Sequence, residues 1–293
     1  MGMEQMAQFI VDEDKCVGCG KCVNVCSGMV LELKDGIPQM KSFDRFGWSG
    51  CWKCQHCIAV CPERAISIFG KKPENSPKFP DESIGENIDQ LVVTRRSCRR
   101  YLDKNVDKAL MDVIMCDMEN VPTGGNSLAL EFTVIDDKDE MERLRGIAYA
   151  GMEANARRGH YSSGMSRWMY GKMKQSEDTV RKGDMLFCSA PHLFVAHQRA
   201  KGQWASDAIA DCNIASAYFE LICNAHGLGT VMMSYSASVI CDVPEARMAL
   251  GIPEDHYMGL IIGFGYSEIK YARGVQKDRH TKIHRYTTSR KQK

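Results

Sequence analysis

Eight cysteines in the first quarter of the chain have the type and spacing for metal chemistry. Two runs follow the pattern CxxCxxCxxxC, the second with a proline directly behind it: Cys16, Cys19, Cys22 and Cys26, then Cys51, Cys54, Cys57 and Cys61. Three thiolates on one short loop wrap three irons of a [4Fe-4S] cubane, while the fourth cysteine of each run reaches the other cluster. The spacing therefore predicts two [4Fe-4S] clusters, one held by Cys16, Cys19, Cys22 and Cys61 and the other by Cys51, Cys54, Cys57 and Cys26.

A pair of structural zinc sites is the alternative for these cysteines, because CxxC pairs also bind zinc. Zinc takes four ligands, usually as two separated pairs, so a third cysteine at the same interval in both runs favours iron–sulfur clusters. Gly18 and Gly20 suit a tight loop whose N–H groups point at cluster sulfurs. The region resembles two-cluster ferredoxins, except that Ser27 stands where a proline usually follows the first run.

An aromatic insertion separates the two runs. It contains Phe46, Trp48 and Trp52, which we interpret as packing around the clusters, with docking of another protein as the alternative.

An arginine-rich run at residues 95–101 offers groups that bind phosphate. Arg95, Arg96 and Arg99 lie around Ser97, just before a predicted helix. Guanidinium groups and a serine hydroxyl suit a phosphate monoester, which they bind through charge-assisted hydrogen bonds. Taken alone, such a run is more often a solvated face, so a second feature is needed to interpret it.

A turn-forming segment, Val-Pro-Thr-Gly-Gly-Asn-Ser at residues 121–127, lies some twenty positions later. Its glycines let the backbone approach a ligand, and Thr123 and Asn126 offer side-chain hydrogen bonds. In this order and separation, the two segments resemble those of the nitroreductase-like flavoproteins. The resemblance extends over about residues 91–285 and, with the cysteine runs, makes the chain look like a ferredoxin–nitroreductase fusion.

This resemblance implies a bound FMN and assigns residues to it. The FMN phosphate would be held by Arg95, Ser97, Arg99, Lys277 and Arg279. The flavin ring and ribityl chain would be contacted by Arg96, Thr123 and Asn126, with Met232, Met233 and Ser234 near N5. The resemblance also implies a homodimer in which each FMN lies at the subunit interface. No catalytic side chain is predicted, because the chemistry is centred on the flavin.

The chain departs from this family in three places. Leu128, Ala129 and Leu130 stand where many relatives have Gln-Pro-Trp, so that part of the flavin environment is open. The glycine pairs at 227–229 and 263–265 do not continue as GxGxxG, so they do not indicate a bound NAD(P). The segment 161–174 matches nothing in the family; we interpret its methionines and aromatic residues as packing, with a substrate-covering lid as the alternative.

Around these motifs, the sequence pattern predicts an α+β protein of two domains. Residues 1–72 form a two-cluster ferredoxin-like domain, the proline-containing segment 73–90 a linker, and residues 91–293 a nitroreductase-like FMN-binding domain. Hydrophobic spacing predicts helices at 106–118 and 208–226, the latter capped by Gly227, and strands at 9–11, 30–33, 131–135, 192–196, 230–233 and 258–262.

The composition and the hydropathy of the sequence indicate which classes of partner and which cellular location to expect. The 293 residues are 44% hydrophobic and 26% charged, with a formal net charge of +1, so we expect neither nucleic acid nor a membrane as partner. The N-terminus lacks a secretory signal, and no window approaches about 18 consecutive apolar residues, so we expect a cytoplasmic protein. The six remaining cysteines are expected to be buried small hydrophobic residues.

Clusters carry single electrons, whereas FMN accepts them one at a time and delivers a pair. We therefore expect an oxidoreductase that passes electrons from a low-potential donor protein such as ferredoxin, through the clusters and FMN, to a small nitro-type or conjugated acceptor. The alternatives are an electron-transfer or redox-sensing protein that acts on a protein partner, and reductive chemistry of another kind, such as dehalogenation or enoate reduction.

Overall fold

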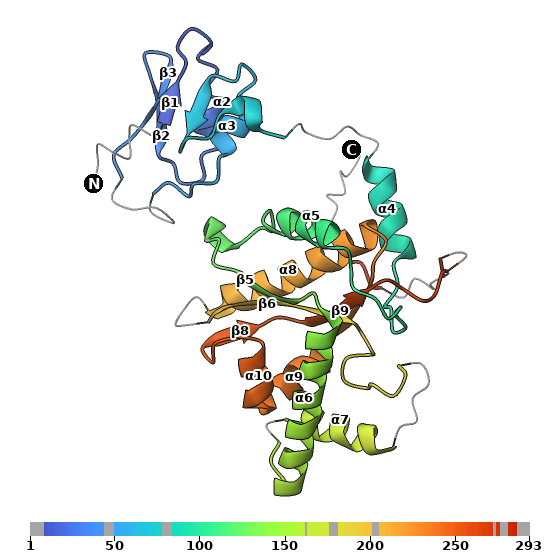
Figure 1. Cartoon of the computed structure of the whole chain (residues 1–293). Coiled ribbons are helices and arrows are strands. Elements are labelled where there is room, and N and C mark those ends of the chain that lie inside the picture. The colour runs from blue at the N-terminus through green and yellow to red at the C-terminus, as the bar shows by residue number, and fades with distance from the viewer. Residues whose placement is uncertain are drawn as a thin grey trace, which may run out of the picture.

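The computed structural model places a small cysteine-rich domain beside a larger domain built on one sheet (Figure 1). It describes residues 9–43, 50–77, 84–161, 163–175, 181–200, 205–271, 274–275 and 281–285. Among the helices of these residues, none is both long enough and apolar enough to cross a membrane.

The cysteine-rich domain contains two antiparallel strand pairs and two short helices. In chain order these are β1 (Phe9–Val11), α2 (Lys21–Asn24), β2 (Leu31–Lys34), β3 (Ile37–Met40), α3 (His56–Val60) and β4 (Ile66–Ile68). Strand β1 pairs with β4, and β2 pairs with β3. The buried side chains include Ile58, Ile66 and Ile68, which pack in one cluster with Cys22 and Cys57. The small core of this domain is thus built around its cysteines.

The two halves of this domain repeat one backbone geometry, offset by the interval from Cys16 to Cys51. Gly18 and Gly20 have φ angles of 65° and 70°, and the residues at the equivalent positions, Lys53 and Gln55, have φ angles of 54° and 61°. A β-carbon on Gly18 would lie 2.8 Å from the carbonyl oxygen of Gly36, so a side chain has no room there. The tight loop predicted from the glycines is therefore confirmed.

Two helical segments lie where a linker was predicted. The 3-10 helix η1 (Pro73–Asn75) follows the cysteine-rich domain, and helix α4 (Ile84–Thr94) leads into the arginine run. Because α4 begins at Ile84, the C-terminal part of the predicted linker 73–90 is helical.

The larger domain is organised around a five-stranded antiparallel sheet in the order β5-β6-β9-β7, with β8 pairing to β6. Its strands are β5 (Glu131–Ile135), β6 (His192–Arg199), β7 (Gly229–Met233), β8 (His256–Met258) and β9 (Ile261–Gly265). The prediction of a single strand at 258–262 is wrong, because two separate strands, β8 and β9, occupy this region. At the break, the Gly259 amide donates to the Ala196 carbonyl, and a β-carbon on Gly259 would lie 2.9 Å from the Cys212 carbonyl oxygen.

Helices cover both faces of this sheet (Figure 1). One face carries α5 (Lys108–Met118) and α8 (Ala205–Ala225), and the other α6 (Lys138–Arg158), α7 (Gly164–Gln175), α9 (Ser234–Asp242) and α10 (Pro244–Ala249). The two buried clusters follow this division, with Phe194 and Phe219 in one and Leu193 and Val195 in the other. Side chains alternate along β6 in this way because successive strand residues point to opposite faces.

Helix α8 ends where the sequence predicted. Gly227 has a φ of 79°, and the Leu228 amide donates to the Cys223 carbonyl at 2.9 Å, which satisfies one of the last carbonyls of the helix. The predicted glycine cap is confirmed, and it places β7 directly behind the turn.

The structure also bears on the interpretation of segment 161–174 and on the expected burial of the six remaining cysteines. Segment 161–174 contributes most of α7, in which Met169 is 1% exposed and Tyr170 packs against the core, as the packing interpretation expects. Cys116 and Cys241 are exposed, so the expectation that all six remaining cysteines are buried was wrong for these two.

Candidate redox sites

The structure brings together the two predicted sets of cysteines. Cys16, Cys19 and Cys22 line one pocket with Cys61, which comes from the second run. The electrostatic neighbours of Cys57 are Cys54, Cys51 and Cys26, the last of which comes from the first run. Each set thus contains three cysteines of one run and the fourth of the other, which is the arrangement that two cubane clusters need. The assignment of individual ligands stays a prediction.

The surroundings of these sulfurs fit a cluster. Burial raises the pKa of the Cys57 thiol to about 12, and it also raises the pKa values of Cys22 and Cys51. Iron is bound by the thiolate, so cluster assembly must displace these protons. Main-chain amides already point at two of the sulfurs, from Lys53 to Cys51 Sγ at 3.4 Å and from Ala65 to Cys61 Sγ at 3.3 Å. Such N–H groups stabilise the negative charge that cluster sulfurs carry.

A cleft of about 660 Å³ lies beside the arginine run. Its lining includes Arg95 and Arg96, the turn at Gly227–Gly229, and Ser267. This volume falls within the range of about 300–1,000 Å³ that is typical of small-molecule and cofactor sites.

The two arginines at this cleft have different partners. The Arg95 Nε makes no well-directed hydrogen bond among the described residues, but it lies 3.2 Å from a carboxylate oxygen of Glu220 on α8, so the charge of this guanidinium is already paired. Arg96 donates from Nη1 to the Arg95 carbonyl, but its Nε and Nη2 are buried and have no hydrogen-bond partner among the described residues. A buried guanidinium with unused donors is costly unless an acceptor arrives. Arg96 therefore fits an anionic or carbonyl-bearing ligand in the cleft better than Arg95 does.

Of the other predicted phosphate ligands, the structure describes Ser97 and Arg99. The main chain of Ser97 bridges to Thr230 at the edge of β7, and Arg99 is exposed. Lys277 and Arg279 lie outside the described residues. Their roles stay predictions.

The loop of residues 121–127 contains the 3-10 turn η2 (Gly124–Asn126). The hydroxyl of Thr123 accepts a hydrogen bond from the Leu128 amide at 3.0 Å, so this side chain braces the turn. The Gly124 amide donates to Asp211 Oδ1 on α8 at 3.0 Å, and burial raises the pKa of that carboxyl. Asp211 was not predicted as a functional residue, because only the packing of α8 brings it to the loop.

Asn126 reaches out of the larger domain. Its side-chain Nδ2 donates to the main-chain carbonyl of Trp52 at 2.9 Å, between the cluster cysteines Cys51 and Cys54. Asn126 has a φ of 54°, a left-handed conformation that asparagine tolerates better than most residues. The predicted flavin loop and the predicted second cluster site are therefore in direct contact.

Helix α8 holds the two halves of the predicted flavin site apart. It contacts the loop through Asp211 and the arginine run through Glu220, nine positions later, which corresponds to about 14 Å along a helix axis. Gly124, two positions before Asn126, and Arg95, next to Arg96, thus contact separate turns of the same helix within one chain.

The three residues predicted near flavin N5 differ in exposure. Met233 is fully buried in the core, Met232 is half-buried on the opposite face of β7, and Ser234 is exposed at the start of α9. Consecutive residues of a strand cannot point to the same face. The Met233 side chain therefore belongs to the core, and only its main chain can reach a ligand.

Comparison with known proteins identifies the class. The family model of the nitroreductase family matches residues 92–266, and the model of the 4Fe-4S dicluster domain matches residues 15–66. The chain belongs to the nitroreductase family and carries an N-terminal 4Fe-4S dicluster domain. The predicted family, fold class and oxidoreductase type are confirmed.

Two ferredoxins are similar to about the first quarter of the chain. An uncharacterized ferredoxin of Methanocaldococcus jannaschii is 37% identical over 68 residues, which are 23% of this chain and 84% of the relative. A ferredoxin of Pyrobaculum islandicum is 34% identical over 79 residues, 26% of this chain and 66% of the relative.

Two solved structures share the fold of the larger domain. A nitroreductase with bound FMN from Bacteroides fragilis has a TM-score of 0.51 and 21% identity, and covers 70% of this chain and 100% of its own. A nitroreductase with bound FMN from Desulfitobacterium hafniense has a TM-score of 0.51 and 19% identity, and covers 67% of this chain and 98% of its own.

Proposed function

We propose that this chain is an iron–sulfur flavoprotein oxidoreductase that carries FMN and two [4Fe-4S] clusters. Electrons enter from a low-potential donor protein such as ferredoxin, pass through the clusters to the flavin, and reduce a small nitro-type or conjugated organic acceptor. The FMN bound in the two Bacteroides and Desulfitobacterium nitroreductases, together with the matching family, supports this cofactor.

The observation that carries the proposal is the hydrogen bond from Asn126 to the Trp52 carbonyl. It joins the loop predicted to contact the flavin with the loop predicted to hold the second cluster. Direct contact between these loops supports transfer from cluster to flavin, whereas clusters of purely structural use have no need of it.

When bound, FMN supplies one-electron uptake and two-electron delivery. The protein's own task is to bind and orient it. The Arg96 donors that have no partner among the described residues would hold it in the cleft, and Thr123, Asn126 and the main chain of β7 would shape its surroundings. The separate contacts of the arginine run and the 121–127 loop with α8, at Glu220 and Asp211, support a homodimer in which each flavin contacts both chains. We also propose the domain boundaries 1–72 and 91–293 and a cytoplasmic location.

The first test measures the iron and FMN content of the protein and its turnover, both under strict anoxia. Anaerobically purified protein should contain about eight irons and one FMN per chain. Reduced ferredoxin should drive turnover with a panel of nitro and conjugated acceptors. Zinc in place of iron would refute the cluster assignment, and cluster oxidation by protein partners with negligible small-molecule turnover would identify an electron carrier instead.

The second test separates the relay from the flavin chemistry. Cys54→Ala should dismantle one cluster and abolish most ferredoxin-driven turnover, while a chemical reductant that reaches the flavin directly still supports turnover. Cys116→Ala, at an exposed cysteine outside both cysteine runs, is the matched control. Equal ferredoxin-driven turnover in Cys54→Ala and the parent protein would mean that the clusters are not the entry point for electrons.

A further inference from the structure

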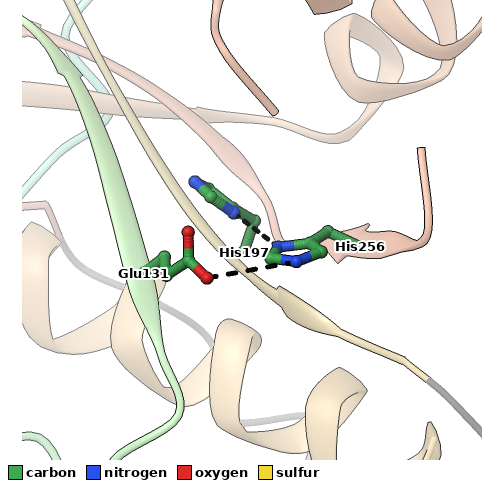
Figure 2. Close-up of side chains that lie close together, drawn as sticks. All are labelled: Glu131, His197 and His256. Atoms are coloured by element: carbon green, nitrogen blue, oxygen red, sulfur yellow. Dashed lines mark hydrogen bonds and ion pairs between the residues drawn. The ribbon is translucent and has the colours of Figure 1, made fainter. Parts of the chain in front are cut away.

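Two histidines and a glutamate converge at one end of the sheet, remote in sequence from the cysteines and the arginine run (Figure 2). Glu131 begins β5, His197 lies near the end of β6, and His256 begins β8. The register of the sheet pairs Glu131 with His197 across the two strands. One potential ligand atom from each of the three side chains lies within 4.8 Å of the others.

The two imidazoles face each other through the same ring atom. His197 Nδ1 lies 3.0 Å from His256 Nδ1, and His197 is only 3% exposed. Two nitrogen ligands on a tetrahedral zinc ion lie about 3.3 Å apart, since each Zn–N bond is about 2.0–2.1 Å long. The nitrogen pair is thus already near the spacing of two ligands on one ion.

Hydrogen bonding leaves a lone pair on His197 Nδ1. The hydroxyl of Thr133 donates its one proton to the Leu250 carbonyl at 3.2 Å, so toward His197 Nε2, at 3.1 Å, it acts as acceptor. Nε2 then carries the ring proton and Nδ1 carries none. A neutral imidazole held by a hydrogen bond from its other nitrogen is the usual state of a metal-binding histidine.

His256 is held in place from its main chain. Arg247 on α10 donates from Nη2 to the His256 carbonyl at 2.7 Å, which fixes the start of β8. The His256 Nε2 lies 4.0 Å from Glu131 Oε1, and the Glu131 side chain is 60% exposed. A divalent cation near the positively charged Arg247 requires a compensating negative charge. The Glu131 carboxylate supplies it.

We propose that Glu131, His197 and His256 form a binding site for a divalent transition metal of the zinc type. The two Nδ1 atoms are the nitrogen ligands, and His256 shifts its ring proton to Nε2, toward Glu131. The carboxylate either completes the ligand set or accepts a hydrogen bond from His256 Nε2–H, and water fills the open positions. Imidazole and carboxylate ligands suit zinc, whereas soft metals prefer thiolate ligands, which this site does not include. The site ties β5, which begins just after the predicted flavin loop, to β6 and β8.

The test is anaerobic equilibrium dialysis of the full holoprotein against micromolar ZnCl₂, with zinc and iron counted in the same sample. The parent protein should take up about one zinc per chain with its iron unchanged. His256→Gln should lose this zinc. Glu131→Gln removes a charge from an exposed side chain without disturbing the core, and should weaken zinc binding by about 10- to 100-fold. His160→Gln, an exposed histidine at the end of α6, is the matched control and should bind like the parent.

X-ray absorption at the zinc edge identifies the ligands. Nitrogen and oxygen neighbours at about 2.0–2.2 Å support the site. A sulfur shell at about 2.3 Å, with loss of iron, would place the zinc in the cluster cysteines and overturn the proposal. Equal zinc uptake by the parent protein, His256→Gln and Glu131→Gln would overturn it as well.

Discussion

The side-chain amide of Asn126 donates a hydrogen bond, 2.9 Å long, to the main-chain carbonyl of Trp52, and this bond connects the two domains. Its donor lies in the loop predicted to contact the flavin, and its acceptor lies between two predicted cluster ligands. Because the acceptor is a main-chain atom, only the asparagine can be varied.

Asn126→Asp should slow reduction of the flavin by reduced ferredoxin. Aspartate keeps the shape and tolerates the left-handed backbone, but it cannot donate to the Trp52 carbonyl. Loss of a hydrogen bond worth about 1 kcal/mol shifts an equilibrium by about fivefold, and stopped-flow flavin absorbance should show a slowing of at least that size. Ser127→Ala, at the neighbouring exposed position, is the control. An unchanged rate in Asn126→Asp, with full iron and FMN content, would show that this contact does not serve the relay.

Arg96→Ala should weaken FMN binding, because Arg96 has buried donors without a partner among the described residues. A charge-assisted hydrogen bond worth about 1.5–3 kcal/mol corresponds to a loss of affinity of roughly 10- to 150-fold. Flavin retained after gel filtration measures the effect. Arg100→Ala is the matched control, since Arg100 is paired with Glu268 through two hydrogen bonds at 3.1 and 3.0 Å. Equal flavin loss in both variants would argue against a specific role for Arg96.

Asp184→Asn should destabilise the larger domain strongly. The Asp184 carboxylate accepts hydrogen bonds from Arg145 Nε at 2.9 Å and the Tyr149 hydroxyl at 2.8 Å, as well as main-chain amides at residues 186, 187 and 189. Removing one partner of a buried ion pair costs about 3–5 kcal/mol. Urea unfolding followed by circular dichroism should show this decrease.

The control for that loss is an exposed ion pair. Asp103→Asn removes the carboxylate that Lys138 contacts at 2.9 Å, and the Asp103 side chain is 85% exposed. Such pairs contribute about 0–1 kcal/mol. A comparable loss of stability in both variants would contradict the central role of Asp184.

Asp211→Asn should make the stability of the larger domain less dependent on pH. Burial, and then the nearby charge of Asp207, raise the pKa of the Asp211 carboxyl above its usual 3.8. The folded state therefore binds its proton more tightly than the unfolded state does, and the resulting stability is fully present below pH 3.8 and lost as pH rises through the folded pKa. The variant keeps an oxygen for the Gly124 amide, so its stability relative to the parent should increase with pH. Parallel curves of unfolding midpoint against pH would contradict a raised pKa.

The sequence by itself determined the chemistry that depends on short-range spacing. Three cysteines within seven positions must share one loop, so the cluster motif, its duplication and the left-handed positions at Gly18 and Gly20 could all be inferred from the order of residues. The helix before Gly227 and the strand at 131–135 were also predicted, because hydrophobic periodicity and a glycine cap are local signals.

Only the tertiary structure decided which partner each side chain has. The resemblance assigns Arg95 to the FMN phosphate and Arg96 to the ring or ribityl chain, but the packing of α8 pairs Arg95 with Glu220 and leaves two buried donors of Arg96 without a hydrogen-bond partner among the described residues. Sheet pairing brings Glu131, His197 and His256 together from three strands, and domain contact joins Asn126 to Trp52. Local signals extend over one or two turns of the chain, whereas these contacts depend on the register and packing of elements far apart in sequence.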